Sequence, residues 1–390
     1  MKKPAIKHLI NLSLLSLAIV FSVLFSEFIL RLIFKPVNFL MPYLVTDEIL
    51  GHKIAPNSGG HDAWGYRNKN VPKNVDIVAI GDSQTYGVSA TADNSWPAIL
   101  QKFTQKKVYN LSLGGYGPPQ YYYLLKNYAL NLHPDTIIIG FYFGNDFLES
   151  YKIVYGKDYW KYLRDDKLSN KWLNDNIDIN NTKEIKSLRP LRYLRNLLAH
   201  HSVLYRILTI YTGDNYKSFE LKYLKKNTND TNITILNTSP SITRTAFTPS
   251  TRLKSENLED ERIQEGIRIN LKLFSEMSDV CKKSRIKFIV LLIPTKENVF
   301  AKYIKNNRDL ENSYTIDKLI DYENSINIIV RSYFNNNNVT YLDSLDYLRE
   351  NFEKKQLYFS DHDGHPNKNG YEVIASSVHQ LLLKTEYMTK

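Results

Sequence analysis

Five short apolar runs, separated by segments with helical periodicity, set the tightest limit on how this sequence can fold. Most of them end at or near a glycine or proline, as buried strands do where the chain turns. Strands that alternate with helices build a parallel sheet with helices on both faces, because each parallel connection needs a crossover. The runs lie at residues 75–80, 107–112, 136–143, 286–293 and 339–342. The sequence therefore predicts an α/β domain, made by residues 75–150 and 253–390.

A long apolar segment near the N-terminus predicts a membrane helix, at residues 9–34. Residues 9–26 carry no charge and would span about 27 Å as a helix, close to the thickness of a bilayer core. Glu27 and Arg31 stand four residues apart, so they can pair on one helix face near the far end.

Three lysines precede this segment and set its expected orientation. By the positive-inside rule, residues 1–8 should lie in the cytoplasm and residues 9–34 should form an uncleaved signal anchor. The rest of the chain would then lie outside, in the periplasm or at the cell surface. A cleaved signal peptide and a buried helix are the alternatives.

Two other regions interrupt the alternation of strands and helices. Residues 35–74 contain four prolines and a cluster of glycines, which predicts an irregular lead-in. Residues 151–252 are rich in asparagine, lysine and tyrosine, and are interpreted as a mainly helical insertion or cap. Within it, residues 188–210 predict a basic amphipathic helix, which would lie on a membrane surface or pack over the α/β domain. Residues 227–250 are polar and predict a loop.

The composition narrows the possible partners. The formal net charge is +11, but lysine and arginine are spread along the chain, which favours a solvated basic surface over a nucleic-acid site. The single cysteine, Cys281, excludes an internal disulfide framework and a multi-cysteine metal site. We expect no nucleic-acid partner and no cofactor.

A serine follows the first predicted strand directly, in residues 81–87 (GDSQTYG). In open α/β sheets, reactive groups gather at the carboxyl ends of strands, so Ser83 can point into a crevice there. Its own N–H would begin a helix, where that donor and the helix dipole favour developing negative charge. A serine N-cap in a tight turn would explain the same residues without catalysis.

The next two predicted strands also end in possible hydrogen-bond donors. Gly114 and Gly115 follow the second strand, and glycine allows a backbone N–H to come close to a ligand. Asn145 follows the third strand, where its side-chain amide can donate a hydrogen bond. Each group alone also fits an ordinary turn.

Two histidines and two aspartates stand within five residues near the C-terminus: Asp361, His362, Asp363 and His365. Pro366 and a predicted helix at residues 368–383 put His365 in the loop before that helix. There a neutral imidazole can take the proton of a serine, and a neighbouring carboxylate can hold its tautomer. A metal ion would suit the same cluster. No second group of ligands is evident in the sequence, so no metal site is predicted.

These four blocks, in this order, resemble the SGNH/GDSL hydrolase superfamily. The resemblance implies that Ser83 is the nucleophile and His365 its base. It also implies an oxyanion hole formed by the N–H groups of Ser83 and Gly115 and the side chain of Asn145. The implied fold has three layers, like flavodoxin, with a five-stranded parallel sheet in the order 2-1-3-4-5.

One position departs from the family pattern. The family usually has an aspartate three residues before the histidine, where this chain has His362. Asp363 is preferred for the role, because the spacing Asp-x-His is similar to that of alginate O-acetyltransferases. Asp361 is the alternative, and a Ser–His dyad helped by a backbone carbonyl is a third possibility.

These features together predict a membrane-anchored serine esterase. Its expected substrates are acyl esters, above all O-acetyl esters, of an envelope or exported glycan, since the lead-in is similar to that of membrane-tethered bacterial members of the superfamily. A polysaccharide O-acetyltransferase with the same three residues, a lipase or thioesterase, and a non-catalytic glycan-binding or assembly component are the alternatives.

Overall fold

The computed structural model describes residues 3–165, 190–209, 234–237, 244–306 and 310–387. The chain forms two compact units. The first, here called the N-terminal unit, comprises Met1–Tyr43, Ile54–Gly65 and Glu184–Thr228. The second, the sheet unit, comprises Leu44–Lys53, Tyr66–Lys183 and Asn229–Lys390.

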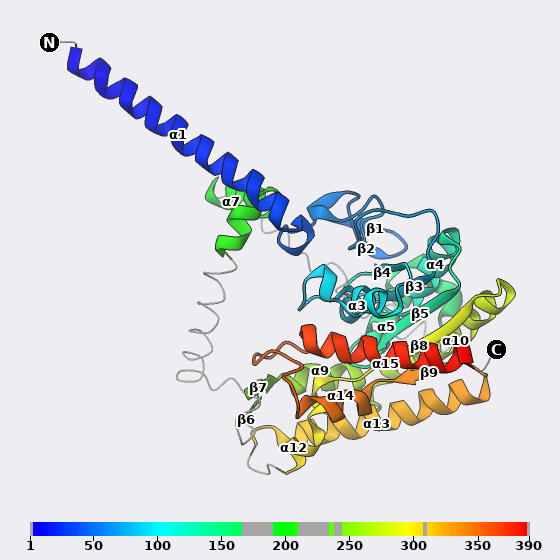
Figure 1. Ribbon diagram of the computed structural model, residues 1–390. Coiled ribbons are helices and arrows are strands. Elements are labelled where there is room, and N and C mark those ends of the chain that lie inside the picture. Colours follow the sequence, from blue (N-terminus) through cyan, green and yellow to red (C-terminus); the bar gives the residue numbers. More distant parts are fainter. Residues whose placement is uncertain (1–2, 166–189, 210–233, 238–243, 307–309, 388–390) are drawn as a thin grey trace. The chain divides into compact units, whose positions relative to one another are not determined.

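The sheet unit is built on five parallel strands in the order β4-β3-β5-β8-β9 (Figure 1). Numbered along the chain, this order is 2-1-3-4-5, so the predicted fold class and strand order are confirmed. The central strands are buried throughout, as their continuous apolar runs require. The strands are β3 (Ile77–Gly81), β4 (Val108–Ser112), β5 (Thr136–Tyr142), β8 (Lys287–Ile293) and β9 (Tyr341–Asp343).

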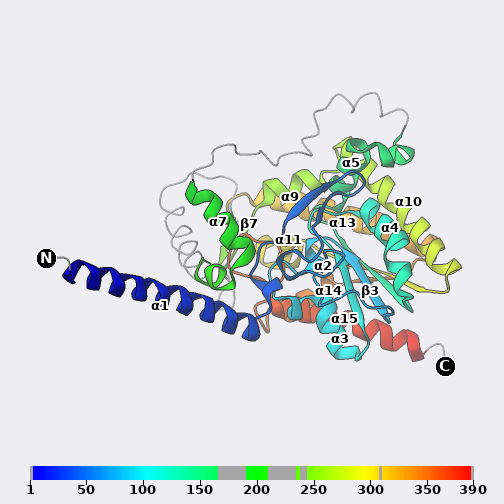
Figure 2. The same ribbon diagram turned by 90° about the horizontal axis from the view of Figure 1, so that it is seen from above.

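Helices cover both faces of this sheet (Figure 2). Ile138 of β5 belongs to a core cluster with residues of α3 (Trp96–Thr104) and α15 (Lys368–Tyr387). Phe141 has the opposite parity on the same strand, and its ring packs against Phe147 and Phe274. The helices on that second face are α4 (Pro118–Asn127), α5 (Asp146–Gly156) and α10 (Glu261–Lys283).

The sheet unit contains further helices in the segments between its strands. They are α2 (Ser83–Tyr86), α9 (Pro249–Glu256), α11 (Lys296–Val299), α12 (Ala301–Lys305), α13 (Ser313–Asn336) and α14 (Leu345–Phe352).

Two strand pairs stand where the sequence predicted irregular structure, so those predictions were wrong. The lead-in contains β1 (Leu44–Asp47) and β2 (Gly51–Ile54), which form a two-stranded sheet. The expected loop at residues 227–250 contains β6 (Thr234–Asn237) and β7 (Arg244–Phe247), which pair antiparallel. Their sequences, LVTD, GHKI, TILN and RTAF, form neither a continuous apolar run nor a clear alternation of apolar and polar residues.

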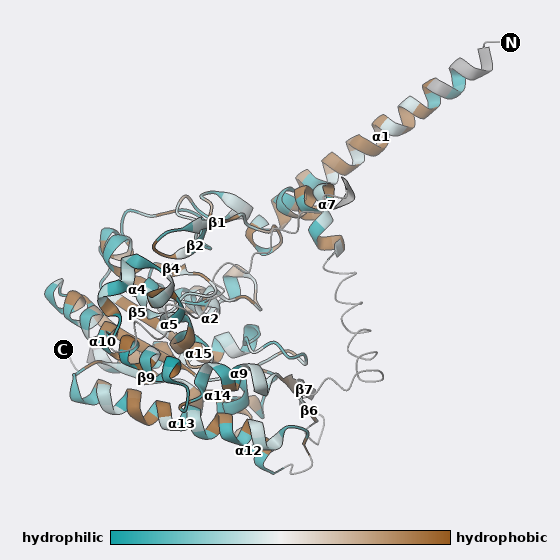
Figure 3. Ribbon diagram, turned by 180° about the vertical axis from the view of Figure 1, so that it is seen from behind, coloured by the Kyte–Doolittle hydropathy of each residue, from teal (hydrophilic) through white to brown (hydrophobic). Residues whose placement is uncertain are grey.

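The N-terminal unit contains one long apolar helix, α1 (Lys3–Ile33), which carries apolar residues along its length (Figure 3). Its segment Ile10–Ile33 has a mean hydropathy of 2.2, and none of the most apolar stretch is buried in protein. By length and composition this helix is a candidate membrane span or signal sequence.

The predicted ion pair near the end of α1 is present, with Arg31 Nε 2.7 Å from Glu27 Oε1. Glu27 also accepts hydrogen bonds from the Ser202 hydroxyl at 3.0 Å and from the Val203 and Leu204 amides, each at 2.9 Å. These bonds cap a second helical stretch, at residues 203–209, after α7 (Pro190–His201).

The single helix predicted over residues 188–210 is therefore broken at Ser202. Ser202 caps the second stretch itself, since its hydroxyl oxygen accepts the backbone N–H of Tyr205 at 3.0 Å, and Glu27 adds its bonds from a distant part of the chain. Residues 188, 189 and 210 lie outside the described residues.

Candidate active site

Ser83 lies at the predicted place, at the start of α2 and directly after β3. The turn is tight: a Cβ atom on Gly81 would stand 2.2 Å from Thr85 Oγ1 and 2.9 Å from the Gly140 carbonyl oxygen. Only glycine fits there. The buried side chain of Asp82 accepts a hydrogen bond from the backbone N–H of Gln84 at 2.9 Å, which caps the short helix. The Ser83 side chain is thereby held at the carboxyl end of β3.

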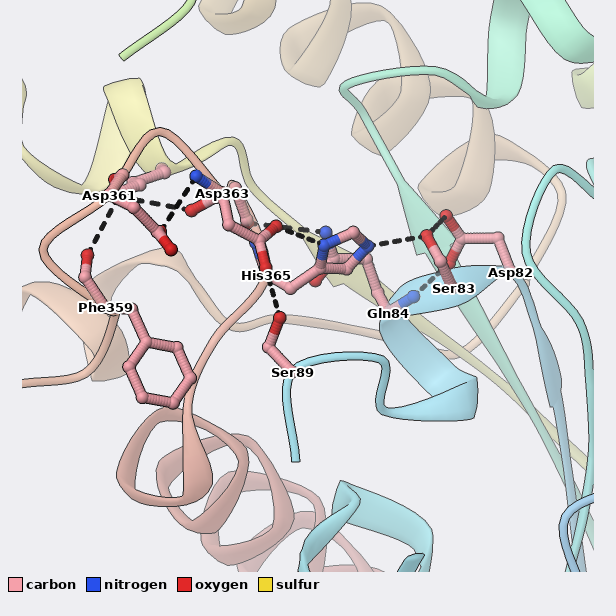
Figure 4. Close-up of polar contacts among 10 residues, drawn as sticks. Asp82, Ser83, Gln84, Ser89, Phe359, Asp361, Asp363 and His365 are labelled. Carbon is pink, nitrogen blue, oxygen red and sulfur yellow. Dashed lines mark hydrogen bonds and ion pairs between the residues drawn. The ribbon is translucent and has the colours of Figure 1, made fainter. Parts of the chain in front are cut away.

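The structure brings Ser83, His365 and Asp363 into one line of hydrogen bonds (Figure 4). His365 Nε2 lies 2.8 Å from Ser83 Oγ, although the two residues are 282 positions apart. On the other side of the ring, His365 Nδ1 lies 2.5 Å from Asp363 Oδ1. The side chains of His365 and Asp363 are 18% and 33% exposed, so an incoming molecule can reach them.

Asp363, and not Asp361, contacts the imidazole. Burial opposes ionisation of Asp363, but the hydrogen bonds from His365 and from the Ser89 hydroxyl outweigh it and hold the pKa of this carboxyl well below its ordinary value. The group is therefore a carboxylate at neutral pH. Asp361 instead accepts the backbone N–H of Asp363 at 3.1 Å, and His362 is exposed to solvent.

Lys296, the first residue of α11, binds the loop that carries Asp363 and His365 and holds it in place. Its ammonium group donates to three carbonyl oxygens of the loop, those of Phe359 at 3.2 Å, Asp361 at 2.8 Å and Asp363 at 3.2 Å. Only 1% of Lys296 is exposed, and this burial lowers the pKa of its side chain to about 8. The sequence analysis missed Lys296, although it follows the end of the fourth strand, where functional groups gather.

The predicted oxyanion donors stand at the ends of the strands beside β3. A Cβ atom on Gly114 would lie 3.4 Å from Ser83 Cβ, so the glycine turn after β4 is packed against the serine. Gly115 has a φ of +79°, a conformation that glycine adopts without strain. His52 of β2, a second residue that the sequence analysis missed, holds this turn through a 2.9 Å hydrogen bond between its Nε2 and the Gly114 carbonyl.

Asn145 stands at the end of β5, on the other side of β3. The buried Asp146 fixes the turn. Its carboxyl accepts hydrogen bonds from the backbone N–H of Tyr142 at 3.0 Å and from the Tyr121 hydroxyl at 3.1 Å. Within the described residues, Oδ1 of Asn145 is buried and has no hydrogen-bond partner. The side-chain oxygen of Asn145 therefore does not accept the hydrogen bond that an Asx turn would need.

Asp82 also contacts the Ser83 hydroxyl, and the sequence analysis gave it no role. Its Oδ2 lies 3.2 Å from Ser83 Oγ, and complete burial raises its pKa to about 6. A hydroxyl has a single proton, so Ser83 can donate to Asp82 or to His365 but not to both. Proton transfer to the imidazole requires the second arrangement.

A hydroxyl, an imidazole and a carboxylate in this order can carry out nucleophilic catalysis, since the imidazole can accept the hydroxyl proton while the carboxylate stabilises the imidazolium. No three His, Cys, Asp or Glu side chains are grouped to hold a metal ion in the part of the chain that the structure describes.

Comparison with known proteins finds similarity in solved structures alone. The chain matches no protein-family model. It also matches no curated protein. One solved structure similar to it is a protein from Desulfitobacterium hafniense that is described as lipolytic and of the G-D-S-L family. The two sequences are 16% identical, the match covers 79% of this chain and 99% of that chain, and the TM-score is 0.36.

Two further similar structures are a GDSL-like lipase from Bacteroides thetaiotaomicron and a mutant of an acetylxylan esterase from Geobacillus stearothermophilus. The lipase is 10% identical, with 81% of this chain and 93% of that chain covered and a TM-score of 0.36. The esterase is 9% identical, with 80% of this chain and 94% of that chain covered and a TM-score of 0.38.

Proposed function

We propose that this protein is a serine esterase in which Ser83 is the nucleophile, His365 its general base and Asp363 the carboxylate partner of the base. The observation that carries the proposal is the continuous hydrogen-bonded line from Ser83 Oγ through the imidazole to Asp363, at 2.8 and 2.5 Å. A serine N-cap that served only the turn would need neither contact.

The reaction begins when Ser83 Oγ attacks the carbonyl carbon of an ester and passes its proton to His365 Nε2. The ester oxygen becomes an oxyanion, for which the N–H groups of Ser83 and Gly115 and the Asn145 amide are the proposed donors. His365 then gives the proton to the leaving alcohol, and an acyl group remains on Ser83. Water, deprotonated by the same imidazole, releases the acid and restores the serine.

A fluorophosphonate probe tests this proposal directly. The full-length wild type should be labelled, and the Ser83→Ala variant should not. Ser325→Ala is the matched control, because Ser325 is exposed on α13 and its hydroxyl bonds only within its own helix. Labelling that survives in Ser83→Ala, or that is absent from the wild type, would contradict the assignment of the nucleophile.

We further infer that the esters are O-acetyl groups on an envelope or exported glycan, reached by a domain that α1 anchors outside the cytoplasm. The supporting features are the apolar helix, the three lysines before it and the resemblance described from the sequence. Release of acetate, measured beside transfer of acetyl groups to an added unacetylated glycan, distinguishes hydrolysis from transfer. If neither occurs with any acetylated glycan, this choice of substrate is wrong.

A further inference from the structure

Arg252 of α9 lies beside the candidate active site, and neither the sequence analysis nor the mechanism gives it a role. Its guanidinium Nη2 would stand 2.7 Å from a Cβ atom on Gly364, the residue between Asp363 and His365. The guanidinium also covers the ring of Tyr142, 5.6 Å from the ring centroid.

The Tyr142 ring connects this arginine to the other side of the site. A Cβ atom on Gly144, the residue before Asn145, would lie 2.5 Å from Cζ of Tyr142, and a Cβ atom on Gly364 would lie 3.5 Å from its hydroxyl. The ring thus touches the two glycines that precede Asn145 and His365. The guanidinium therefore lies directly against the loop of His365 and is connected to the turn of Asn145 through this ring.

The charge of Arg252 has no close partner within the described residues. Its five N–H donors make no hydrogen bond there, and no carboxylate lies within ion-pair distance. Glu297 and Asp363 attract it from farther away, and Asp363 is already bonded to His365 and Ser89. Glu256 is fully buried, and this burial raises the pKa of its carboxyl well above the ordinary value, which favours its neutral form.

An arginine that is only partly buried and whose side-chain donors make no hydrogen bond to the described residues is suited to bind an anion. We propose that Arg252 recognises a carboxylate or phosphate group of the substrate, next to the ester that Ser83 attacks. This inference rests on the proposed esterase function and gives it a substrate class, acyl esters of acidic glycans. A neutral glycan would leave the guanidinium without a partner and would bind less tightly.

Protection of Ser83 from the fluorophosphonate measures this recognition without any acyl group. Oligogalacturonate supplies carboxylates, glucose 6-phosphate supplies a phosphate, and a neutral xylo-oligosaccharide is the reference. We expect at least one acidic compound to slow labelling of the wild type at concentrations where the neutral compound does not. Arg252→Gln should weaken that protection about 10- to 100-fold, the usual value of a charge-assisted hydrogen bond.

Two variants distinguish recognition from a structural role. Lys254→Gln removes the same charge from the exposed side of α9 and should leave the protection close to that of the wild type. Arg252→Lys retains the charge without the planar fork and should protect to an intermediate degree. The inference is overturned if acidic and neutral compounds protect equally, or if Arg252→Gln changes both equally. Absence of any labelling at Ser83 would instead reject the esterase proposal.

Discussion

At the scale of single residues, the choice between Asp363 and Asp361 is the point where the sequence left two candidates and the geometry separates them. Asp363 bonds both the ring and the backbone N–H of His365, at 2.5 and 3.1 Å. Asp361 bonds the backbone N–H of Asp363. One carboxylate therefore serves the imidazole, and the other serves the shape of the loop.

Replacing these two aspartates should have very different effects. Asp363→Asn should lower kcat for a simple acetate ester by about 10⁴-fold, because an amide cannot hold the tautomer or stabilise the imidazolium. Asp361→Asn is the matched control, and its effect on kcat should be far smaller, since an amide oxygen can still accept the N–H of Asp363. Equal losses in the two variants, at equal folded content by circular dichroism, would contradict the assignment of Asp363.

At the scale of elements, the short connection from β8 to α11 supports the C-terminal loop through one buried lysine. Three loop carbonyls converge on the Lys296 ammonium. A buried carbonyl without a donor costs about 1–3 kcal/mol, so this single side chain stabilises the loop that presents His365.

Lys296→Met should lower the free energy of unfolding by about 1–3 kcal/mol and reduce kcat. It should also change the pH dependence of stability. In the folded wild type the pKa of Lys296 is about 8, against 10.5 for an unperturbed lysine. Between these values the unfolded chain binds more protons than the folded one, so this group makes the stability rise with pH from 8 to 10.5.

The variant should lack that rise, as urea denaturation of the full chain in detergent at several pH values would show. Lys283→Met is the control, because Lys283 is exposed at the end of α10 and the rise should persist there. If the stability of Lys296→Met kept the same slope as the wild type, the pH effect would belong to another group.

The elements that could be predicted are those whose signal lies in their own residues. β5 and β8 are seven-residue apolar strands, and the end of β5 led to the proposed donor Asn145. β1 and β2 have four residues each and gave no such signal. The bonds of Glu27 to Ser202 and of Lys296 to the C-terminal loop join residues 175 and 63–67 positions apart, and no local pattern encodes such contacts.

At the scale of the whole molecule, the sequence predicted the sheet and the residues that meet at its edge, because strand order and strand ends follow from general rules of α/β folds. It favoured Asp363 as the partner of His365 but kept Asp361 as an alternative, since a two-residue difference in spacing is decided by the shape of the loop. Nor did it find Arg252, whose helix follows a segment with no strong periodicity.

The proposed orientation of the chain can be measured with single cysteines. The natural Cys281 is buried, which raises its pKa to about 12, so it should react little with a membrane-impermeant maleimide. In intact cells that express the full chain, Lys368→Cys should be labelled and Lys7→Cys should be labelled only after permeabilisation. The reverse pattern would invert the topology. Loss of the first residues, seen by intact mass, would identify a cleaved signal instead.

The arrangement of His365 and Asp363 on one clamped loop has a consequence for how activity can vary. The proposed base and its carboxylate are two residues apart, so the geometry between them is set within the loop and should persist when other parts of the molecule change. The one separation that the tertiary structure must set is the gap between that unit and the serine hydroxyl. Substitutions remote from the site should therefore change the rate mainly by changing one distance, the one between the Ser83 hydroxyl and the His365 ring. Their effects on rate should follow that distance.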